Sequence, residues 1–372
     1  MKALTGAGED IAIKLNRLRS YMKEEGHEGV LLQRKDNFAW LTSGGFNGVP
    51  QNSDAGECGL YITQEQVCIV TNTIEKPRVT VEELTGLSYD TIEYPWYETM
   101  EDGLIQAGVK HRVASDLPLG QIDHCVVNLA SLRYALTTLE VERLRSLGAR
   151  TTAIMETFCM KLTPGMTEVQ IAGDLNRAFM HEGLTPTVTL VGADERIDQY
   201  RHPVATKKPF YQKCMVIACV QAYGLTVALT RIVHAGRLPD SLRKIHEHTV
   251  WIDAELIAAT KPGVRASQLL HTLKTAYQRV GYQDEWMRHH QGGAIGYENR
   301  DYLLTPSSTF EVQQWQPYAW NPSITGTKSE DTMLVNGNDS EIITSTQTTD
   351  WPMITVETSN GTKIERPAIY QL

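Results

Sequence analysis

The sequence predicts an α+β protein in two parts: a smaller α/β domain over residues 1–130, and a larger domain over 131–372 in which helices cover curved antiparallel strands. Three observations predict this class. In the first part, short apolar runs broken by Gly, Asn and Asp alternate with helical segments. The second part opens with two long segments whose apolar residues recur at helical spacing. Two hairpin patterns follow, around Ala222-Tyr223-Gly224 and around Asn336-Gly337-Asn338.

The first domain begins with a helix over residues 11–26, which stops at Gly26. A short helix over 75–84 and a strand over 111–117 come near its end. Between the first helix and these elements, four apolar runs read as short strands. They are GVLLQR (29–34), NFAWLT (37–42), GLYIT (59–63) and QVCIVTN (66–72).

The second domain begins with a helix over 137–162, followed by a turn at Pro164-Gly165 and a second helix capped by Thr167. Two further helices are expected over 241–260 and 266–281. The remaining segments are predicted to be strands, namely 188–192, 214–221, 225–233, 330–335 and 341–346.

Composition narrows the function. The net charge is −9 and no run of Lys or Arg occurs, which argues against a nucleic-acid surface. No stretch approaches the roughly 20 apolar residues of a membrane span, and the N-terminus has no signal-peptide core. The six cysteines form no CxxC pair and sit mostly among apolar residues, as free thiols do in a reducing cytoplasm. We therefore expect a cytoplasmic protein that acts on a small molecule.

Five motifs, each of low specificity alone, occur in an order that is specific when they are taken together. They are residues 139–175, RHPVAT (201–206), GLTVALTR (224–231), QGGAIGYENRD (291–301) and NPSITGTKSEDTMLV (321–335). Together they resemble the pita-bread hydrolases, which include methionine and Xaa-Pro aminopeptidases, prolidase and creatinase. Residues 29–49 are similar to the N-terminal domain of the creatinase type. The resemblance implies a C-terminal pita-bread domain preceded by a smaller creatinase-type domain.

Peptidases of this fold hold two metal ions with two Asp, one His and two Glu. The residues at the matching positions are Ile217 or Ala218, Ala228, Gly293, Asn321 and Glu330. One carboxylate cannot hold two divalent ions, so we expect no metal cofactor. His289 and His290 are adjacent, and on an extended chain adjacent side chains point to opposite sides. His289 is therefore expected to face away from the site.

Catalytic groups remain by resemblance. His202 matches the His-Pro histidine of the family and suits a general base, or else is a structural residue at a Pro-defined turn. Glu330 is expected to bind a cationic group or orient water, the alternative being a salt bridge to Lys328 or Arg231. His290 is the third candidate, because it precedes the lost histidine ligand in the same loop.

Substrate-binding candidates surround these motifs. Arg300 suits a bidentate clamp on a carboxylate, the alternative being an ion-paired surface residue. The other candidates in this domain are Asn321, Tyr297, Gln291, Trp320 and Arg231. By resemblance to creatinase we also expect a homodimer, in which Trp40 and Phe46 of the N-terminal domain complete the partner's pocket. The plainer interpretation of Trp40 is an inward residue on a buried strand.

The expected function is a metal-independent hydrolase acting on a C–N bond of a small amide, amidine or guanidino compound. His202 would be the base, and Glu330 would bind or polarise the substrate. One alternative is an Xaa-Pro aminopeptidase-like peptidase with a non-standard metal site. Another is a non-catalytic descendant that binds a small molecule or a protein. A lyase or isomerase on the same acid–base pair is also open.

Overall fold

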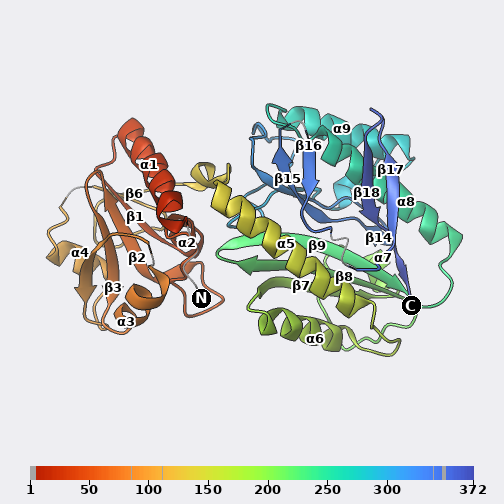
Figure 1. Cartoon of the computed structure of the whole chain (residues 1–372), viewed down its shortest axis with the longest axis horizontal. Coiled ribbons are helices and arrows are strands. Elements are labelled where there is room, and N and C mark those ends of the chain that lie inside the picture. The colour runs from red at the N-terminus through yellow and green to blue at the C-terminus, as the bar shows by residue number, and fades with distance from the viewer. Residues whose placement is uncertain (1–5, 85, 111, 338, 346–348) are drawn as a thin grey trace. The chain divides into compact units, whose positions relative to one another are not determined.

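The computed structural model describes residues 6–84, 86–110, 112–337, 339–345 and 349–372 (Figure 1). It divides into two compact units. Unit 1 comprises Met1–Glu140 and Tyr223–Leu225, and unit 2 comprises Val141–Ala222 and Thr226–Leu372. None of the described helices is both long and apolar enough to cross a membrane.

Unit 1 is built on a mixed six-stranded sheet in the order β4-β3-β2-β1-β5-β6. Its strands are β1 (Gly29–Arg34), β2 (Ala55–Thr63), β3 (Val67–Asn72), β4 (Asp90–Tyr94), β5 (Val113–Ser115) and β6 (His124–Val126). Its helices are α1 (Ala7–Glu25), α2 (Lys35–Leu41), α3 (Lys76–Arg78), the π-helix η1 (Val79–Glu83), α4 (Met100–Gln106) and the 3₁₀ helix η2 (Ala130–Arg133). The expected first helix is confirmed, and its cap Gly26 has φ 72°.

One expected strand of unit 1 is wrong. Residues 37–42 were predicted to be a strand, but they lie in helix α2 and its cap. The four residues from Phe38 to Leu41 are all buried, so the run lacks the alternation that marks a half-buried strand. The Thr42 amide bonds to the Phe38 carbonyl at 3.0 Å, which closes the helical turn. Trp40 is therefore a buried helix residue.

Unit 2 contains two main sheets, β19-β9-β8-β7 and β11-β10-β12-β15-β16, with two small pairs, β13-β14 and β17-β18. Its strands are β7 (Thr185–Ala193), β8 (Lys213–Ala222), β9 (Leu225–His234), β10 (Gly292–Ala294), β11 (Tyr302–Leu303), β12 (Pro317–Trp320), β13 (Ser323–Ile324), β14 (Thr327–Lys328), β15 (Asp331–Asn336), β16 (Asp339–Ile342), β17 (Met353–Glu357), β18 (Lys363–Pro367) and β19 (Tyr370–Gln371). Both predicted hairpins, β8–β9 and β15–β16, are confirmed, although Asn338 lies outside the described residues.

Helices flank these sheets (Figure 1). They are α5 (Thr138–Cys159), α6 (Glu168–His181), α7 (Arg196–Gln199), α8 (Asp240–Ala259), α9 (Ala266–Arg279) and the 3₁₀ helix η3 (Glu285–Arg288). Helix α6 packs on β7, and α8 packs on α9, β17 and β18. Thr167 caps α6 as predicted, in a reciprocal capping box with Gln170. The α+β class is confirmed.

Strand β9 joins the two main sheets of unit 2. The Thr226 amide donates to the Gly296 carbonyl at 2.7 Å, and the Thr230 amide donates to the Glu330 carbonyl at 3.0 Å. Between them, the Ala228 amide donates to the Thr332 hydroxyl at 2.8 Å. These bonds bring β9, the loop after β10 and the start of β15 side by side, where the sequence places its site motifs.

Candidate functional site

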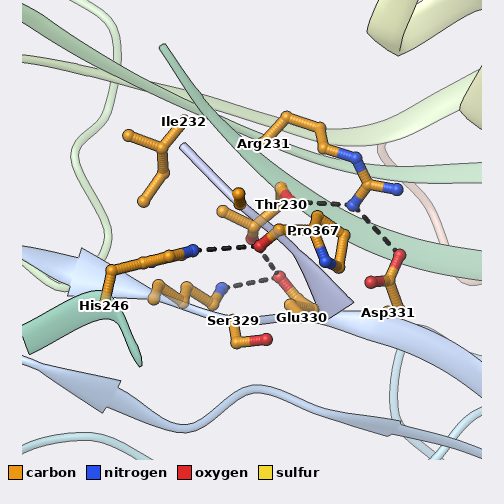
Figure 2. Close-up of a pocket in the computed structure, with 10 residues that line it drawn as sticks. Thr230, Arg231, Ile232, His246, Ser329, Glu330, Asp331 and Pro367 are labelled. Atoms are coloured by element: carbon orange, nitrogen blue, oxygen red, sulfur yellow. Dashed lines mark hydrogen bonds and ion pairs between the residues drawn. The ribbon is translucent and has the colours of Figure 1, made fainter. Parts of the chain in front are cut away.

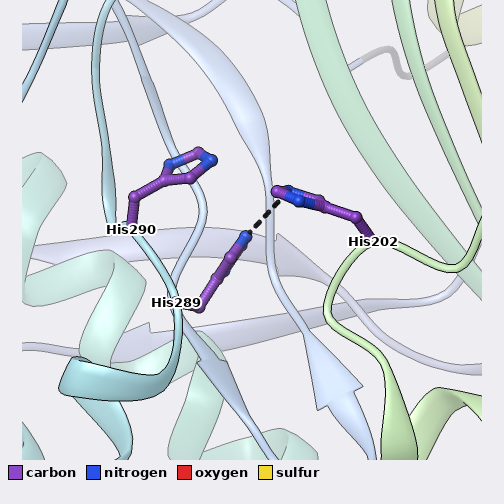
Figure 3. A group of neighbouring side chains, drawn as sticks. All are labelled: His202, His289 and His290. Carbon is purple, nitrogen blue, oxygen red and sulfur yellow. Dashed lines mark hydrogen bonds between the residues drawn. The ribbon is translucent and has the colours of Figure 1, made fainter.

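Three imidazole rings converge in unit 2 (Figure 3). His202 comes from the loop after α7, and His289 and His290 come from the segment between η3 and β10. The Nε2 atoms of His289 and His202 are 3.1 Å apart. One nitrogen from each of the three rings lies within 4.8 Å of the other two. We call these residues the three-histidine cluster.

The expectation that His289 faces away is wrong. Alternation of side chains needs a regular strand, and β10 begins only at Gly292, whose φ is 95°. Gln291 also folds the segment back, because its Nε2 donates to the His289 carbonyl at 2.6 Å and to the Trp286 carbonyl at 3.1 Å. The rings of His289 and His290 therefore lie on one side, with centroids 4.5 Å apart.

Glu330 forms the second part of the site, with both carboxylate oxygens engaged. Oε2 accepts from the Thr230 hydroxyl and pairs with the Lys328 ammonium, both at 2.7 Å. Oε1 accepts from Nη2 of Arg300 at 2.8 Å. The structure thus realises the salt bridge to Lys328, and not one to Arg231. We call Glu330, Lys328, Arg300 and Thr230 the Glu330 cluster.

Charge fixes the protonation of Glu330. Burial alone would raise the pKa of this carboxyl group, but Lys328 and Arg300 outweigh burial and lower the pKa to about 2. Glu330 is therefore ionised at neutral pH. Lys328 is a residue of the site that the sequence motifs do not predict, and it stands two positions before Glu330.

The histidines are neutral at the same pH. Burial, then Lys328, lowers the pKa of His289 to about 2. Burial, then Arg300, lowers the pKa of His290 to about 4. The pKa of His202 is also lowered, by burial and then by Lys328, while Glu330 opposes the shift. His289 and Lys328 also line one small pocket, so we treat the two clusters as one candidate site.

Arg231 borders the Glu330 cluster, but its guanidinium is taken up by buried acceptors, and its role in binding substrate stays a prediction. Its side chain is fully buried, and all three guanidinium nitrogens have acceptors in unit 2. Nε donates to Glu156 at 2.7 Å, Nη1 to Asp331 at 3.0 Å and Nη2 to the Thr344 carbonyl at 2.9 Å. Together with Arg366 and Asp253, these residues make up what we call the buried ion network.

Other predicted residues have mainly packing roles. Trp320 is buried and stacks on Tyr318 with ring centroids 5.3 Å apart, and its Nε1 donates to Thr260 at 3.0 Å. It belongs to the hydrophobic core, which corrects its assignment to a pocket wall. Tyr297 is also buried. Gln291 positions the histidine segment and accepts from the Tyr277 hydroxyl at 2.8 Å.

Unit 1 holds the last two candidates. Trp40 is fully buried within α2, whereas the Phe46 side chain is exposed. Their contribution to a partner's pocket stays a prediction, as does the homodimer.

Three buried polar atoms of the site have no partner among the described residues. They are Nδ1 of His290, Nε of Arg300 and Oδ1 of Asn321. Asn321 stands at the position of a lost Glu ligand. Its backbone N–H donates to the backbone carbonyl of Gln291 at 3.1 Å, and Gln291 follows His290 in the chain. A buried polar group left dry costs about 1–3 kcal/mol, so native proteins normally supply it with a partner. These atoms therefore point to a bound ligand or water.

The residues present do not fit the two-metal site of the fold. Ile217, Ala218, Ala228 and Gly293 have no side-chain ligand atom. The backbone also excludes a histidine at position 293, because a Cβ added there would lie 2.0 Å from the Tyr302 carbonyl oxygen. A two-metal centre of that kind is therefore incompatible with this chain.

A small cavity of about 10 Å³ lies beside the Glu330 cluster (Figure 2). Its lining includes Thr230, Lys328, Glu330, His246 and Pro367. Such a volume holds about one water molecule. The cavity itself is therefore too small for a substrate.

In unit 2, helices flank two main sheets, and the polar centre lies near β9, β10 and β15. The family model for metallopeptidase family M24 matches residues 142–337, which is more than half of the chain. The chain therefore belongs to metallopeptidase family M24, with the pita-bread fold.

Relatives agree with this assignment. The chain is 22% identical to the uncharacterized peptidase YqhT of Bacillus subtilis over 366 residues, covering 89% of this chain and 98% of that protein. It is 24% identical to a protein named Xaa-Pro dipeptidase of Pyrococcus horikoshii, covering 50% of this chain and 56% of that protein.

Solved structures agree on the fold. The Xaa-Pro dipeptidase from Bacillus anthracis superposes with a TM-score of 0.77 at 18% identity, covering 90% of this chain and 98% of that one. The N-terminal domain of the FACT complex subunit SPT16 from Cicer arietinum superposes with a TM-score of 0.70 at 12% identity, covering 90% and 97%. Proteins as different as a dipeptidase and a FACT complex subunit share this fold, so the chemistry has to be argued from the site.

Proposed function

We propose that this protein hydrolyses the C–N amide bond of a short peptide or another small amide at the site formed by the two clusters. Family membership and the similarity to proteins named Xaa-Pro dipeptidase support this reaction class. The observation that carries the proposal is the set of unpartnered polar atoms on His290, Arg300 and Asn321 beside an ionised Glu330.

Each group has a task in this reaction. Lys328 and Arg300 are cations beside the place where a carbonyl oxygen gains negative charge, so they stabilise the tetrahedral intermediate. Glu330 keeps both cations in place. We assign the activation of water to the three-histidine cluster, in which His202 is the exposed member. Water adds to the carbonyl carbon, the C–N bond breaks, and the proton from water goes to the leaving nitrogen.

The test is an assay of amine release from a panel of dipeptides, with and without Pro in the second position, and of small primary amides. We expect turnover by the wild-type chain and a loss of about 100-fold or more in kcat/KM for Glu330→Gln, because both cations lose their counter-charge. Arg177→Met is the matched control, since Arg177 is 81% exposed on α6 and pairs only loosely with Asp174.

A folded wild-type protein that binds members of the panel but cleaves none of them would overturn the proposal. It would instead favour the non-catalytic binder. Equal activity in wild type and Glu330→Gln would show that cleavage occurs elsewhere or comes from a contaminant.

A further inference from the structure

We propose that His202, His289 and His290 bind one divalent transition-metal ion of the kind that prefers imidazole ligands, such as zinc or cobalt. This site uses none of the five positions that hold metal in peptidases of this fold. The binding itself is independent of the proposed function. The role of the ion in activating water rests on that function.

The spacing of the nitrogens fits one ion. Two ligands that are each 2.0–2.1 Å from a tetrahedral ion lie about 3.3–3.4 Å apart. The Nε2 atoms of His202 and His289 are 3.1 Å apart, so these two rings stand almost at ligand distance. The ligand atom of His290 is within 4.8 Å of both, so a ring displacement of about 1–1.5 Å completes the set.

Proton bookkeeping on the rings also fits. Without an ion, one Nε2 must carry a proton to bridge His289 and His202. A tautomer change that puts the single proton of each ring on its own Nδ1 frees both Nε2 atoms with no net loss of a proton. The protonated Nδ1 of His289 can then donate a hydrogen bond to the Ser323 hydroxyl, whose oxygen lies 3.4 Å away. Orientation of a ligand imidazole through its second nitrogen is the usual arrangement in metal sites.

His290 supplies an independent observation. Its Nδ1 is buried without a partner among the residues that the structure describes. Such a nitrogen is expected to have a ligand or water as its partner. The side-chain amide of Gln291 donates to the backbone carbonyls of His289 and Trp286, and these bonds keep the rings of His289 and His290 on one side.

Local charge narrows the kind of ion. The three imidazoles are neutral, and the neighbouring Glu330 is already paired with Lys328 and Arg300. Magnesium, calcium and manganese need oxygen ligands and negative charge, which this site lacks. Imidazole suits zinc, cobalt, nickel and copper. Because His202 is exposed, a fourth coordination position is open toward solvent, as in catalytic sites with three protein ligands.

Untagged, chelator-treated protein is titrated with Co²⁺ and Zn²⁺. Elemental analysis after dialysis gives the stoichiometry, and visible absorption of the cobalt form reports the geometry. We expect one ion per chain with a tetrahedral cobalt spectrum, and at least tenfold weaker binding in His202→Ala and His290→Ala. Magnesium should not compete. His181→Ala is the control, because His181 is 84% exposed on α6.

Glu330→Gln separates this site from a remnant of the two-metal site. We expect the variant to keep the ion. Failure to bind an ion in wild type, or loss of binding in Glu330→Gln with retention in the histidine variants, overturns the proposal. Full activity in ion-free protein also overturns its role in catalysis but leaves the proposed function standing. Stoichiometric ion without any cleavage sinks the proposed function and leaves the metal site standing.

Discussion

Arg231 and Arg300 hold buried carboxylates in the same unit, yet their surroundings differ. The Arg231 side chain is fully buried, and each of its nitrogens has an acceptor. The Arg300 side chain is 14% exposed, and its Nε has no partner among the described residues. A saturated cation can only support the fold, whereas a cation with a spare donor can also bind a ligand.

The same contrast separates the buried ion network from the Glu330 cluster. The first lies around Asp331, one residue after Glu330, and ties β9 to α5 and β15. The Glu330 cluster interacts electrostatically with His202 of the three-histidine cluster. Within the same candidate site, Oδ1 of Asn321 has no partner among the described residues. Two adjacent residues, Glu330 before β15 and Asp331 at its start, thus belong to different groups of ion pairs. The predictions below test this division, ordered by their expected effect on the free energy of unfolding.

The largest effect is expected for Arg231→Met. Removing this cation leaves the buried Glu156 without its cation, while Asp331 keeps Arg366, and breaking such a buried pair costs about 3–5 kcal/mol. Urea unfolding followed by circular dichroism measures the loss. A decrease below about 1 kcal/mol would show that the network is not structural, and the contrast with Arg300 would fail.

His246 lines the small cavity beside the Glu330 cluster, and its titration tests how strongly this region is buried. It is buried between the Thr327 hydroxyl and the Pro367 carbonyl, at 2.7 and 3.0 Å, and burial lowers its pKa to about 4. The unfolded chain binds the proton near pH 6.5, so stability is fully present above that pH and falls as pH drops toward 4. The fall is about 3 kcal/mol.

His246→Gln keeps both hydrogen-bonding groups and removes the titration. Unfolding free energies measured from pH 7 to pH 4 should therefore decline less steeply in the variant, by about 3 kcal/mol over the window. Parallel curves for the two proteins would mean that burial does not lower the pKa of His246 in the folded state.

Gly293 tests whether the vacated ligand position belongs to the architecture. A single added Cβ would meet the Tyr302 carbonyl at 2.0 Å, so Gly293→Ala should destabilise the protein by about 1–3 kcal/mol. The control is Gly173→Ala in α6, where a Cβ meets nothing within 4 Å and alanine should add up to about 1 kcal/mol. If thermal and urea unfolding show both variants equally stable, strand β10 has room for a side chain, and the exclusion of a histidine there is wrong.

Much of the fold was readable because residue spacing carries it. Hairpin turns, the Thr167 cap and helical periodicity are local signals, and they placed both hairpins and most helices. The loss of the two-metal site was also readable, since Ala228 and Gly293 have no ligand atom in any fold.

The direction of a side chain, and whether all its hydrogen-bonding atoms have partners, could not be predicted from the sequence, because both depend on residues far away in the chain. The position of His289 follows from Gly292 and from the bonds of Gln291, which override strand alternation. The saturation of Arg231 depends on Glu156, 75 residues away in the chain. The helix at Trp40 was missed because a short apolar run suits either kind of element.

Arg300→Met is expected to change stability least and chemistry most. Glu330 keeps Lys328 and Thr230 as partners, so the loss of unfolding free energy should be smaller than in Arg231→Met. Catalysis loses a donor at the site of developing charge, and kcat/KM should fall about 100-fold or more. Unfolding free energy and kcat/KM are measured on both variants. Arg231→Met should lose mainly stability, and Arg300→Met should lose mainly kcat/KM.

If Arg300→Met instead loses stability as Arg231→Met does, with unchanged kcat/KM for the folded fraction, the unpartnered Nε of Arg300 has no ligand to bind. The Glu330 cluster would then be a second structural ion network, because the unpartnered atom would be an inert cost of the fold.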